Sequence, residues 1–536
     1  MKLPLHNLVL TPMLLLVSLF SLSQVNLTSS NLPIIKINTN GNLIEDNIRI
    51  SADLEIIYNG IGARNYTSDP SNDYNGKISI ELRGSSSQNY PKKSYSFETQ
   101  DSIGENNNVS LIDLPVENDW TLIAPYSDKT LMRNVLTYHL ANKMGNYAPR
   151  TKFCEVLLNG DYQGVYVLTE KIKRDNDRVD IYEMDDDDIL GDSLTGGYIV
   201  KIDKTTGGSN IGWTSSYSPP NRPIEEINFL FHYPKEDDIE HEQEDYIENY
   251  ISEFEDVLSD TIFTDSINGY AKYIDVLSFI DFYIINELTR NVDGYRSSTF
   301  LHKDRLGKLN AGPVWDFNIS LGNADYCDGE LTTGWAKDFN YTCPTCGKCV
   351  PFWWERLLED SYYENSLKCR WETLRLNELS NQFINSYINS LSNYLDESQQ
   401  RNFQKWNVLG VHVGPNYFIG NTYQEEINYL KNWLNDRVDW LDANIPGDCN
   451  GLNIYHNENG IFKLYPNPVS DVLKITFNNN NVQKNIRIYS LNGKRLFSTY
   501  SSDSVLNLDL NNLDKGVYII EVIEKGIKSS KKIVKV

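Results

Sequence analysis

The chain has 536 residues, of which 40% are hydrophobic, and this size and composition fit two to four folded domains with a large apolar core. Its 73 Asp and Glu residues outnumber its 49 Lys and Arg residues, which gives a formal net charge of −24 at pH 7. This excess of negative charge disfavours nonspecific binding to nucleic acid or anionic lipid, so the sequence argues against a role on DNA.

The first 24 residues have the pattern of a secretory signal peptide. Lys2 precedes an apolar run from about Leu8 to Leu22, and small or polar residues follow the run. The run is short for a membrane span and lacks a stop-transfer cluster of charges, and no other segment approaches eighteen consecutive apolar residues. We therefore predict that residues 1–24 are removed and that the mature protein is soluble outside the cytoplasm, with no membrane span.

The next part of the chain predicts strands, then a helix, then a hairpin. Residues 32–98 alternate between apolar and polar side chains and are interrupted by Gly and Asn, a pattern typical of half-buried antiparallel strands. Across residues 128–144, apolar side chains recur at the spacing of an amphipathic helix. Two further strands, 151–158 and 164–170, are joined through Asn159-Gly160, a strong signal for a tight hairpin.

Helical patterns dominate the middle of the chain. Residues 240–258 and 270–289 predict helices, and the second is apolar nearly all round, as expected of a buried helix. From residue 352 to about 443 the pattern is again mostly helical. After the Gly- and Asn-rich connector 446–459, residues 461–536 show short alternating strands with turn signals, which predict a small β-sandwich.

Two carboxylates lie at the ends of one supersecondary unit. Asp293 follows the second of these helices, and Asp316 follows a predicted hairpin of strands 298–303 and 308–310. Each acid alone has a simple structural interpretation, because Asp before Gly is common in turns and Asp316 could cap a turn. A turn does not need a second acid one hairpin away, however, and Asp316 stands between two aromatic residues, where a charge is costly unless it is paired or metal-bound.

This spacing matches the arrangement that phosphoryl transfer requires. One carboxylate lies beside the accepting hydroxyl and another binds Mg²⁺, and in protein kinases the metal-binding Asp follows the catalytic Asp by one hairpin. Asp293 and Asp316 are 23 residues apart, which leaves room for a loop and two short strands. We therefore predict that the two acids meet around one magnesium nucleotide.

Seven cysteines include a C-x2-C-x2-C cluster at Cys343, Cys346 and Cys349, with Cys327 nearby in the sequence. Two interpretations remain open, disulfides formed in an oxidising compartment or a zinc or iron site of these four thiolates. Export favours disulfides. Because seven is an odd number, we expect one thiol to remain, and Cys154 on an apolar strand is the candidate for a buried free thiol.

Several specific motifs occur together in one order along the chain. They are Arg83-Gly84-Ser85-Ser86-Ser87-Gln88, Pro91-Lys92-Lys93-Ser94-Tyr95, Leu131-Met132-Arg133-Asn134, Asn159-Gly160 to Tyr166, Asn291-Val292-Asp293-Gly294-Tyr295 and Gly312-Pro313-Val314-Trp315-Asp316-Phe317. Over about residues 32–443 the chain closely resembles the CotH family of atypical protein kinases, named for a spore-coat protein. The terminal segment, with Leu464-Tyr465-Pro466-Asn467-Pro468-Val469 and Gly516-Val517-Tyr518, is similar to the sorting domain read by the bacterial type IX secretion machinery.

The resemblance implies an α+β fold with two lobes like those of a protein kinase, a mainly β small lobe and a mainly α large lobe, followed by a small all-β sandwich. The expected boundaries are a signal peptide at 1–24, a CotH-like kinase domain at 25–445, a linker at 446–460 and a sorting domain at 461–536. The order of strands, helix and hairpin in the first part of the chain matches that of a kinase small lobe.

The implied activity is transfer of the γ-phosphoryl group of ATP to a Ser or Thr hydroxyl of an extracellular or surface protein, with Mg²⁺ or Mn²⁺. Asp293 would orient or deprotonate the accepting hydroxyl, and Asp316 would hold the metal against the phosphates. The implied partners are this acceptor protein and the type IX secretion machinery, with no nucleic acid.

Three further positions follow from the kinase resemblance as nucleotide-binding residues. Lys93, or its neighbour Lys92, would neutralise phosphate charge. The loop from Arg83 to Gln88 would cover the nucleotide, although it could equally be a turn that connects two strands. Glu170 would end the hinge segment beside adenine.

The chain departs from the general kinase pattern at two places. Five residues after Asp293, where kinases carry a metal-binding Asn, it has Ser298, so Asn318 or Asn323 would have to supply an amide oxygen. The helix at 128–144 lacks the expected Glu partner for the lysine, which leaves Glu81 or Glu155 as alternatives.

Two other functions therefore stay open. One is a catalytically weak or inactive protein with the kinase fold that serves cell-surface assembly or binding. The other is a metal or redox centre at the cysteine cluster of an otherwise structural protein.

Overall fold

The computed structural model describes residues 25–204, 212–343, 348–449, 462–477, 479, 482–490, 495–524 and 527–535. The predicted signal peptide, most of the predicted linker and Cys346 lie outside these ranges. Within them, no helix is both long enough and apolar enough to cross a bilayer.

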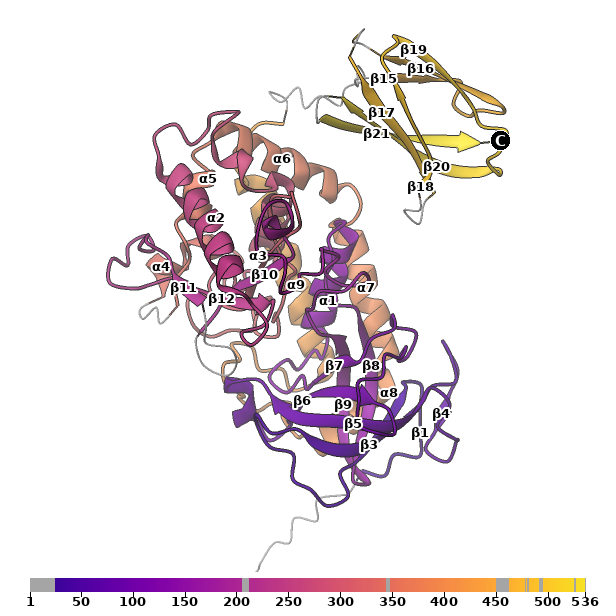
Figure 1. The fold of residues 1–536 in the computed structure, drawn as a ribbon. Helices are drawn as coiled ribbons and strands as arrows, with labels where there is room; N and C mark the ends of the chain where they lie inside the picture. The colour runs from indigo at the N-terminus through magenta and orange to yellow at the C-terminus, as the bar shows by residue number, and fades with distance from the viewer. Residues whose placement is uncertain are drawn as a thin grey trace, which may run out of the picture. The chain divides into compact units, whose positions relative to one another are not determined.

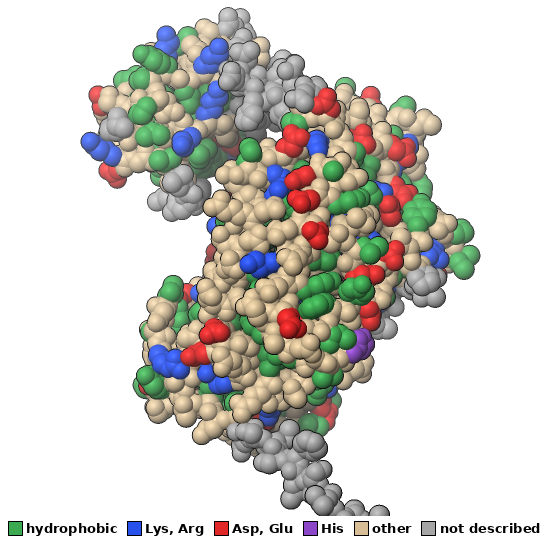
Figure 2. Space-filling view, turned by 180° about the vertical axis from the view of Figure 1, so that it is seen from behind, with side chains coloured by type: hydrophobic (Ala, Val, Ile, Leu, Met, Phe, Trp, Pro, Cys, Tyr) green, Lys and Arg blue, Asp and Glu red, His purple; other side chains and the backbone are tan. Residues whose placement is uncertain are grey.

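The chain divides into two compact units. Figure 1 colours the chain from indigo at the N-terminus to yellow at the C-terminus. The first consists of Met1–Asp360 with Trp371–Asn444, and the second of Ser361–Arg370 with Ile445–Val536. In the first unit, acidic side chains are spread over the face shown in Figure 2, with Lys and Arg side chains among them.

Seven strands of the first unit close into a β-barrel. In barrel order they are β2 (Ile34–Asn38), β3 (Ile50–Ile57), β5 (Tyr74–Arg83), β6 (Ser94–Gln100), β7 (Asp119–Ile123), β9 (Asp161–Glu170) and β8 (Thr151–Leu158). Neighbours are antiparallel except β2 and β8, which run parallel where the barrel closes. Ala52, Leu54 and Ile56, at every second position of β3, are fully buried in the barrel core, because alternate side chains of a strand point to one face.

One strand of this barrel was missed by the sequence patterns. The predictions for residues 33–170 correspond to β2, β3, β5, β6, β8 and β9, but β7 pairs with β6 on one side and β9 on the other and so completes the closed barrel. The mixed α+β class is confirmed, with a β-rich N-terminal part, helices in the middle and all-β sheets at the C-terminal end. The division into two kinase lobes remains a prediction.

Helices and a five-stranded sheet form the rest of the first unit (Figure 1). The sheet has the order β11 (Gly212–Thr214), β12 (Asn228–Tyr233), β10 (Tyr198–Ile202), β13 (Thr299–Lys303) and β14 (Leu309–Ala311). The helices are α1 (Arg133–Lys143), α2 (His241–Ser259), α3 (Val276–Thr289), α4 (Phe339–Thr342), α5 (Trp353–Leu357), α7 (Asn381–Tyr394), α8 (Asp396–Lys405) and α9 (Tyr423–Asn444). Helix α6 (Ser361–Arg375) is divided, because its residues Ser361–Arg370 belong to the second unit. Two short strands, β1 (Ser29–Ser30) and β4 (Asn65–Tyr66), pair with each other.

Helix α3 is the buried helix that the sequence predicted. Its residues from Ser278 to Thr289 are all buried, as an all-round apolar pattern requires. The helix begins later than expected because Asp275 caps it, with its carboxylate accepting a hydrogen bond from the Ser278 N–H at 2.8 Å. It ends at Arg290, whose φ of 43° is left-handed.

Helix α8 packs on the barrel through a buried ion pair. The Glu155 carboxylate of β8 is fully buried and accepts hydrogen bonds from Arg401 Nε at 2.9 Å and Arg401 Nη2 at 2.5 Å, as well as from the Tyr162 hydroxyl. Nearby, the buried Lys92 ammonium donates to Asn402 Oδ1 at 2.8 Å and to the Val165 carbonyl. These contacts join helix α8 to the barrel at strands β8 and β9.

The second unit contains two sheets that share one core, as the predicted β-sandwich requires. One sheet has the order β15 (Phe462–Tyr465), β16 (Val472–Phe477) and β19 (Val505–Asp509). The other has the order β18 (Arg495–Ser501), β17 (Lys484–Ser490), β20 (Gly516–Glu524) and β21 (Ile527–Lys535). Ile475 of the first sheet and Ile488 of the second are fully buried in the same core.

Two disulfides are present, Cys327–Cys343 with an S–S distance of 2.07 Å and Cys369–Cys449 with 2.06 Å. The prediction of disulfides in the cysteine cluster is thus confirmed for Cys327–Cys343, whereas the pair Cys369–Cys449 was not predicted. The alternative of a site made of four thiolates is wrong, because Cys327 and Cys343 are bonded to each other. Cys154 has a fully buried thiol that contacts the Tyr166 carbonyl, in agreement with the expected leftover thiol.

The buried pair of Arg401 and Glu155 gives a test of the fold. Replacing Arg401 with Met should lower the free energy of unfolding by about 3 kcal/mol, because Glu155 would stay buried without its cation. A urea titration measures the loss, and adding Glu155→Gln should recover part of it. Lys405→Met is the matched control, since it removes a cation from a more exposed pair with Asp161 and should cost less than about 1 kcal/mol. Equal losses in the two single variants would contradict the role given to Glu155.

Candidate active site

Asp293 stands in a tight turn that follows helix α3. The Gly294 N–H donates to the Asn291 carbonyl at 2.9 Å, and the Asp293 carbonyl accepts from the Ser297 N–H at 3.0 Å. A side chain at Gly294 would meet Asn286 Oδ1 at 2.6 Å, so the turn requires glycine at this position. The Asp293 carboxylate is half-buried and accepts no hydrogen bond from the described residues. It is therefore able to accept a proton or a hydrogen bond from an incoming group.

Asp316 follows the hairpin of β13 and β14, and helix α1 holds its backbone. The Asp316 N–H donates to the Tyr138 hydroxyl at 3.1 Å, and the Phe317 N–H donates to Asn134 Oδ1 at 2.7 Å. On the other side, Asn291 Nδ2 lies 3.5 Å from the Asp316 carbonyl. The φ of Asp316 is 66°, a left-handed value that is uncommon for a residue with a side chain and is often found at functional sites.

The two acids lie close enough to interact electrostatically. Burial, together with the negative charges of Asp293 and Asp203, raises the pKa of the Asp316 carboxyl to about 6, while Arg83 and Lys348 oppose the shift. Two like charges that share a half-buried site are unfavourable without a cation. The fold thus brings together the pair that the sequence singled out.

Arg83, at the end of β5, also belongs to this site. Its guanidinium lies over the Trp315 ring at 5.1 Å, and its Nη1 is buried with no hydrogen-bond partner among the described residues. Burial lowers the pKa of Arg83, and the nearby Asp316 opposes that shift. A buried donor without an acceptor is costly, so an anionic ligand that reaches Arg83 would be favoured.

The loop after Arg83 is a compact turn. Gly84 has a φ of 98°, and a side chain there would meet Ser87 Oγ at 2.1 Å. Gln88 Nε2 donates to the Gly84 carbonyl at 2.7 Å, and Lys93 Nζ donates to the Gln88 carbonyl at 2.6 Å. Lys93 is thus tied to the loop that was predicted to cover a nucleotide.

Neither of the predicted acidic partners of Lys93 is engaged with it. Glu81 forms an ion pair with Arg49 at 3.0 Å, and Glu155 is bound to Arg401. Its neighbour Lys92 points into the protein instead, is 2% exposed, and has a pKa that burial lowers to about 7.

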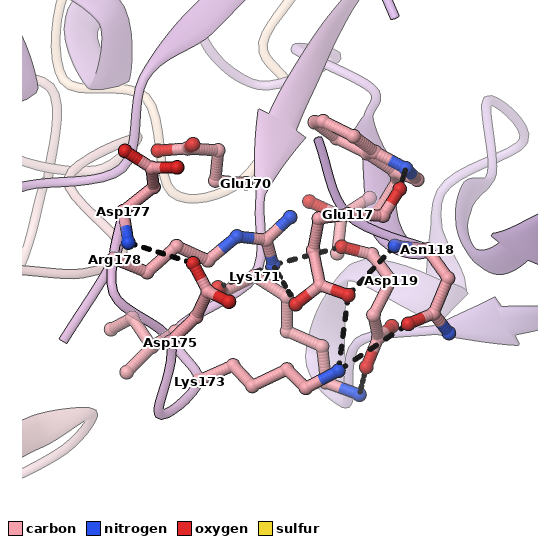
Figure 3. A network of polar contacts seen from close by, with 12 residues as sticks. Glu117, Asn118, Asp119, Glu170, Lys171, Lys173, Asp175, Asp177 and Arg178 are labelled. Carbon is pink, nitrogen blue, oxygen red and sulfur yellow. Dashed lines mark hydrogen bonds and ion pairs between the residues drawn. The ribbon is translucent and has the colours of Figure 1, made fainter. Parts of the chain in front are cut away.

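The carboxylate of Glu170 is fully buried and occupied. It is bound by Arg150 Nη2 at 2.7 Å, by the Arg150 N–H at 2.8 Å and by the Tyr147 hydroxyl at 3.2 Å. Figure 3 shows the polar network around Lys171 and Lys173, which follow Glu170 in the chain. Lys171 pairs with Asp119 at 2.9 Å, and Lys173 pairs with Glu117 at 3.1 Å. This network fixes the segment that the sequence predicted as a hinge.

The predicted auxiliary ligands differ in their availability. Ser298 and Asn318 are half-buried; Ser298 directly follows Ser297, and Asn318 is two residues after Asp316. Asn323 has its amide committed, because its Nδ2 donates to the Asn318 carbonyl at 2.8 Å and its Oδ1 accepts from Asn416 at 2.9 Å. Of the two candidate amides, Asn318 is therefore the available one.

Three residues of the site had no signal in the sequence. Asp203 accepts from the Ser297 hydroxyl at 3.1 Å, and Lys348 Nζ donates to the same hydroxyl at 2.7 Å. Asp203 reaches Ser297 because β10 pairs with β13, with Ile202 opposite Thr299. Such a long-range pairing is not readable from local patterns.

The disulfide Cys327–Cys343 lies beside the Asp293 turn. Arg296 Nη1 is 3.3 Å from the sulfur of Cys343, and Arg296 Nη2 is 3.8 Å from that of Cys327. The Nε of the same arginine donates to the Val292 carbonyl at 2.7 Å. The cysteine segment and the turn therefore share one buried arginine.

A divalent cation fits this set of residues. Among the described residues there is no group of three or more His, Cys, Asp or Glu side chains that could hold a metal. Mg²⁺ does not require such a cage, because it is usually bound by one or two carboxylates together with water and substrate phosphates. The raised pKa of Asp316 and the unpartnered Nη1 of Arg83 suit a cation with its attached anion.

Two cavities of the first unit lie elsewhere. One of about 230 Å³ is bordered by α1, α3 and the residues 310–314, and one of about 580 Å³ is bordered by residues 180–185 with Asp304 and Arg305. Neither is lined by Asp293 or Asp316. The site of the two acids is therefore identified from the positions and contacts of its side chains and not from either of these cavities.

Comparison with known protein families decides the classification. Residues 80–441 match the family model described as CotH kinase protein, which spans more than half of the chain. The chain belongs to the CotH kinase family. Residues 463–536 of this CotH-family protein match the model described as secretion system C-terminal sorting domain. No curated protein matches the chain. Both resemblances seen in the sequence are confirmed.

The raised pKa of Asp316 predicts a gain in stability for Asp316→Asn. Because the pKa is about 6 in the folded protein and 3.8 for the unperturbed group, the wild-type side chain favours folding below about pH 4, and this contribution is lost as the pH rises through 6. The variant should therefore exceed the wild type in free energy of unfolding by about 1 to 2 kcal/mol at about pH 8 and match it at about pH 4.

Urea titrations at the two pH values measure this difference. Asp187→Asn, which removes one charge from an exposed position, controls for the general effect of net charge. A variant at position 316 that is less stable than the wild type at the higher pH would contradict the electrostatic account.

Proposed function

We propose that this CotH-family protein is an exported protein kinase that transfers the γ-phosphoryl group of ATP to a Ser or Thr hydroxyl of an extracellular or surface protein. The observation that carries the proposal is the electrostatic coupling of Asp293 and Asp316, two acids that flank one β-hairpin. Phosphoryl transfer needs one acid at the acceptor and one at the metal, and this pair supplies both within one site.

Asp293 is the proposed catalytic base. Its carboxylate is half-buried, lies in a rigid turn and accepts no hydrogen bond from the described residues, so an acceptor hydroxyl can occupy that place. Asp293 would align this hydroxyl and take its proton as the bond to phosphorus forms.

Asp316 is the proposed metal ligand, with Ser298 and Asn318 as neighbouring oxygen donors. When bound, Mg²⁺ or Mn²⁺ would neutralise the charge of the phosphate oxygens and orient them. Helix α1 keeps Asp316 in place by holding its N–H group and that of Phe317. A residue held in this way loses little freedom when the metal binds.

Arg83 and Lys93 are the proposed nucleotide-binding cations, carried by the turn from residue 83 to 88. Arg83 has the unpartnered Nη1 beside Asp316, and Lys93 is tied to the turn through the Gln88 carbonyl. For Glu170 we propose a position at the hinge beside adenine in which its own carboxylate holds the backbone of Arg150.

The C-terminal domain supports export. Its family is that of secretion sorting domains, and we propose that the type IX machinery recognises it after a signal peptide at residues 1–24 has been removed. The two disulfides are compatible with an oxidising compartment outside the cytoplasm. The acceptor protein would then be encountered outside the cell or at its surface.

A second candidate function is a scaffold that has the kinase fold but no turnover. It is favoured by Ser298 at the position of the metal-binding Asn and by the committed amide of Asn323. Such a protein would bind nucleotide or partner proteins without transferring phosphate.

Phosphate transfer from labelled ATP distinguishes the two. The purified mature chain with Mg²⁺ or Mn²⁺ should label itself, casein or histone, and Asp293→Asn should lower the rate by a factor of about 100 to 10,000 while leaving nucleotide affinity unchanged. Asp187→Asn is the matched control and should keep the full rate. Labelling that persists undiminished in Asp293→Asn would rule out the proposed base, and nucleotide binding without any labelling would favour the scaffold.

A further inference from the structure

Lys348 is a cation of the site for which the sequence motifs predicted no role. It lies within the C-x2-C-x2-C segment, directly before Cys349, and its Nζ donates to the Ser297 hydroxyl at 2.7 Å. Ser297 in turn donates to Asp203 and has its N–H bound by the Asp293 carbonyl at 3.0 Å. The ammonium group is therefore linked through one side chain to the turn that carries the proposed base.

Lys348 also acts on the proposed metal ligand. Its charge lowers the pKa of Asp316, against the effects of burial and of the two neighbouring acids, so it lies within electrostatic reach of that carboxylate. Among the described residues, Arg83 and Lys348 are the cations whose charges lower the pKa of Asp316. Lys92 and Lys93, the lysines of the strand motif, are bound to Asn402 and Gln88 instead.

The backbone of Lys348 is positioned by the buried arginine that borders the disulfide. Arg296 Nη1 lies 3.5 Å from the Lys348 carbonyl and 3.3 Å from the sulfur of Cys343. Because Arg296 also binds the Val292 carbonyl, the lysine and the turn are held by the same guanidinium. Functional side chains are commonly held in place by supporting contacts of this kind, whereas a surface lysine has none.

We propose that Lys348, together with the Ser297 hydroxyl, forms a binding subsite for the terminal phosphate of a nucleoside triphosphate. This inference rests on the proposed function, because Asp293 marks the place of the acceptor and Asp316 that of the metal. The terminal phosphate must lie near both, because it is transferred from the metal-bound nucleotide to the acceptor hydroxyl. An ammonium at this place stabilises the charge on its oxygens, as a cation does in other phosphoryl-transfer sites.

The subsite makes a prediction about binding that does not depend on turnover. A cation that contacts only the terminal phosphate strengthens the binding of a triphosphate and leaves the binding of a diphosphate unchanged. Lys348→Met should therefore weaken the binding of the non-hydrolysable analogue AMPPNP with Mg²⁺ by about tenfold, the loss of one charged hydrogen bond, and change ADP affinity by less than about twofold.

Isothermal titration calorimetry on the full mature chain measures both affinities. Lys348→Arg should keep most of the preference for the triphosphate, and Ser297→Ala should lose part of it because the ammonium would lose its anchor. Lys337→Met, a cation paired with Asp338 elsewhere in the first unit, is the matched control. Thermal unfolding of each variant shows whether it is folded, and Lys348→Gln serves if Lys348→Met is not.

The outcomes separate this inference from the proposed function. An equal loss for both nucleotides, or no loss for either, would overturn the subsite, even if Asp293-dependent transfer is observed. A selective loss of triphosphate binding without any transfer would support the subsite while removing the kinase activity. A selective loss together with a slower Asp293-dependent transfer would support both.

Discussion

Helix α1 holds the segment that carries Asp316, and the geometry of the whole site depends on this contact. Asn134 and Tyr138 accept hydrogen bonds from two successive N–H groups of the segment, and Arg133 Nε donates to the Ser320 carbonyl at 3.1 Å. Arg133 is itself buried and paired with Asp128 at 2.6 Å. A buried pair of this kind is costly to break, so the motif around Arg133 and Asn134 has a positioning role that its sequence alone did not reveal.

Electrostatic strain is the second property of the site. Asp316 carries a left-handed backbone conformation and a raised pKa beside other acids, and each of these features costs folding free energy. Burial of apolar side chains, such as those of the barrel core, is the term that offsets such costs. A site with excess negative charge binds a cation more strongly. Under the proposed function, a metal would supply that cation, and the phosphates that it carries would supply oxygens for Arg83 to bind.

Local sequence patterns predicted much of this structure because they report on neighbours in the chain. Alternation predicted the barrel strands β2, β3, β5 and β6, the all-round apolar pattern predicted α3, and Asn159-Gly160 predicted the hairpin of β8 and β9. The spacing of Asp293 and Asp316 predicted a shared site because the intervening hairpin is local. Strand β7 was missed, and its first four residues are all buried, polar and apolar alike, so it lacks the half-buried character of the predicted strands.

The remaining residues of the site depend on contacts between distant parts of the chain. Asp203 and Ser297 meet through the pairing of β10 with β13, and Lys348 arrives from a segment bordered by the Cys327–Cys343 disulfide. The two adjacent lysines could not be told apart in the sequence, yet the fold buries Lys92 against α8 and places Lys93 on the turn. Neither outcome is fixed by neighbouring residues.

A crystal structure of the mature chain with Mn²⁺ and AMPPNP tests the central claim most directly, because the anomalous signal of manganese locates the metal. The account predicts a metal about 2.2 Å from a carboxylate oxygen of Asp316, bound also by phosphate oxygens, with the terminal phosphate facing Asp293. A nucleotide bound away from both acids, or a metal that Asp316 does not contact, would contradict it.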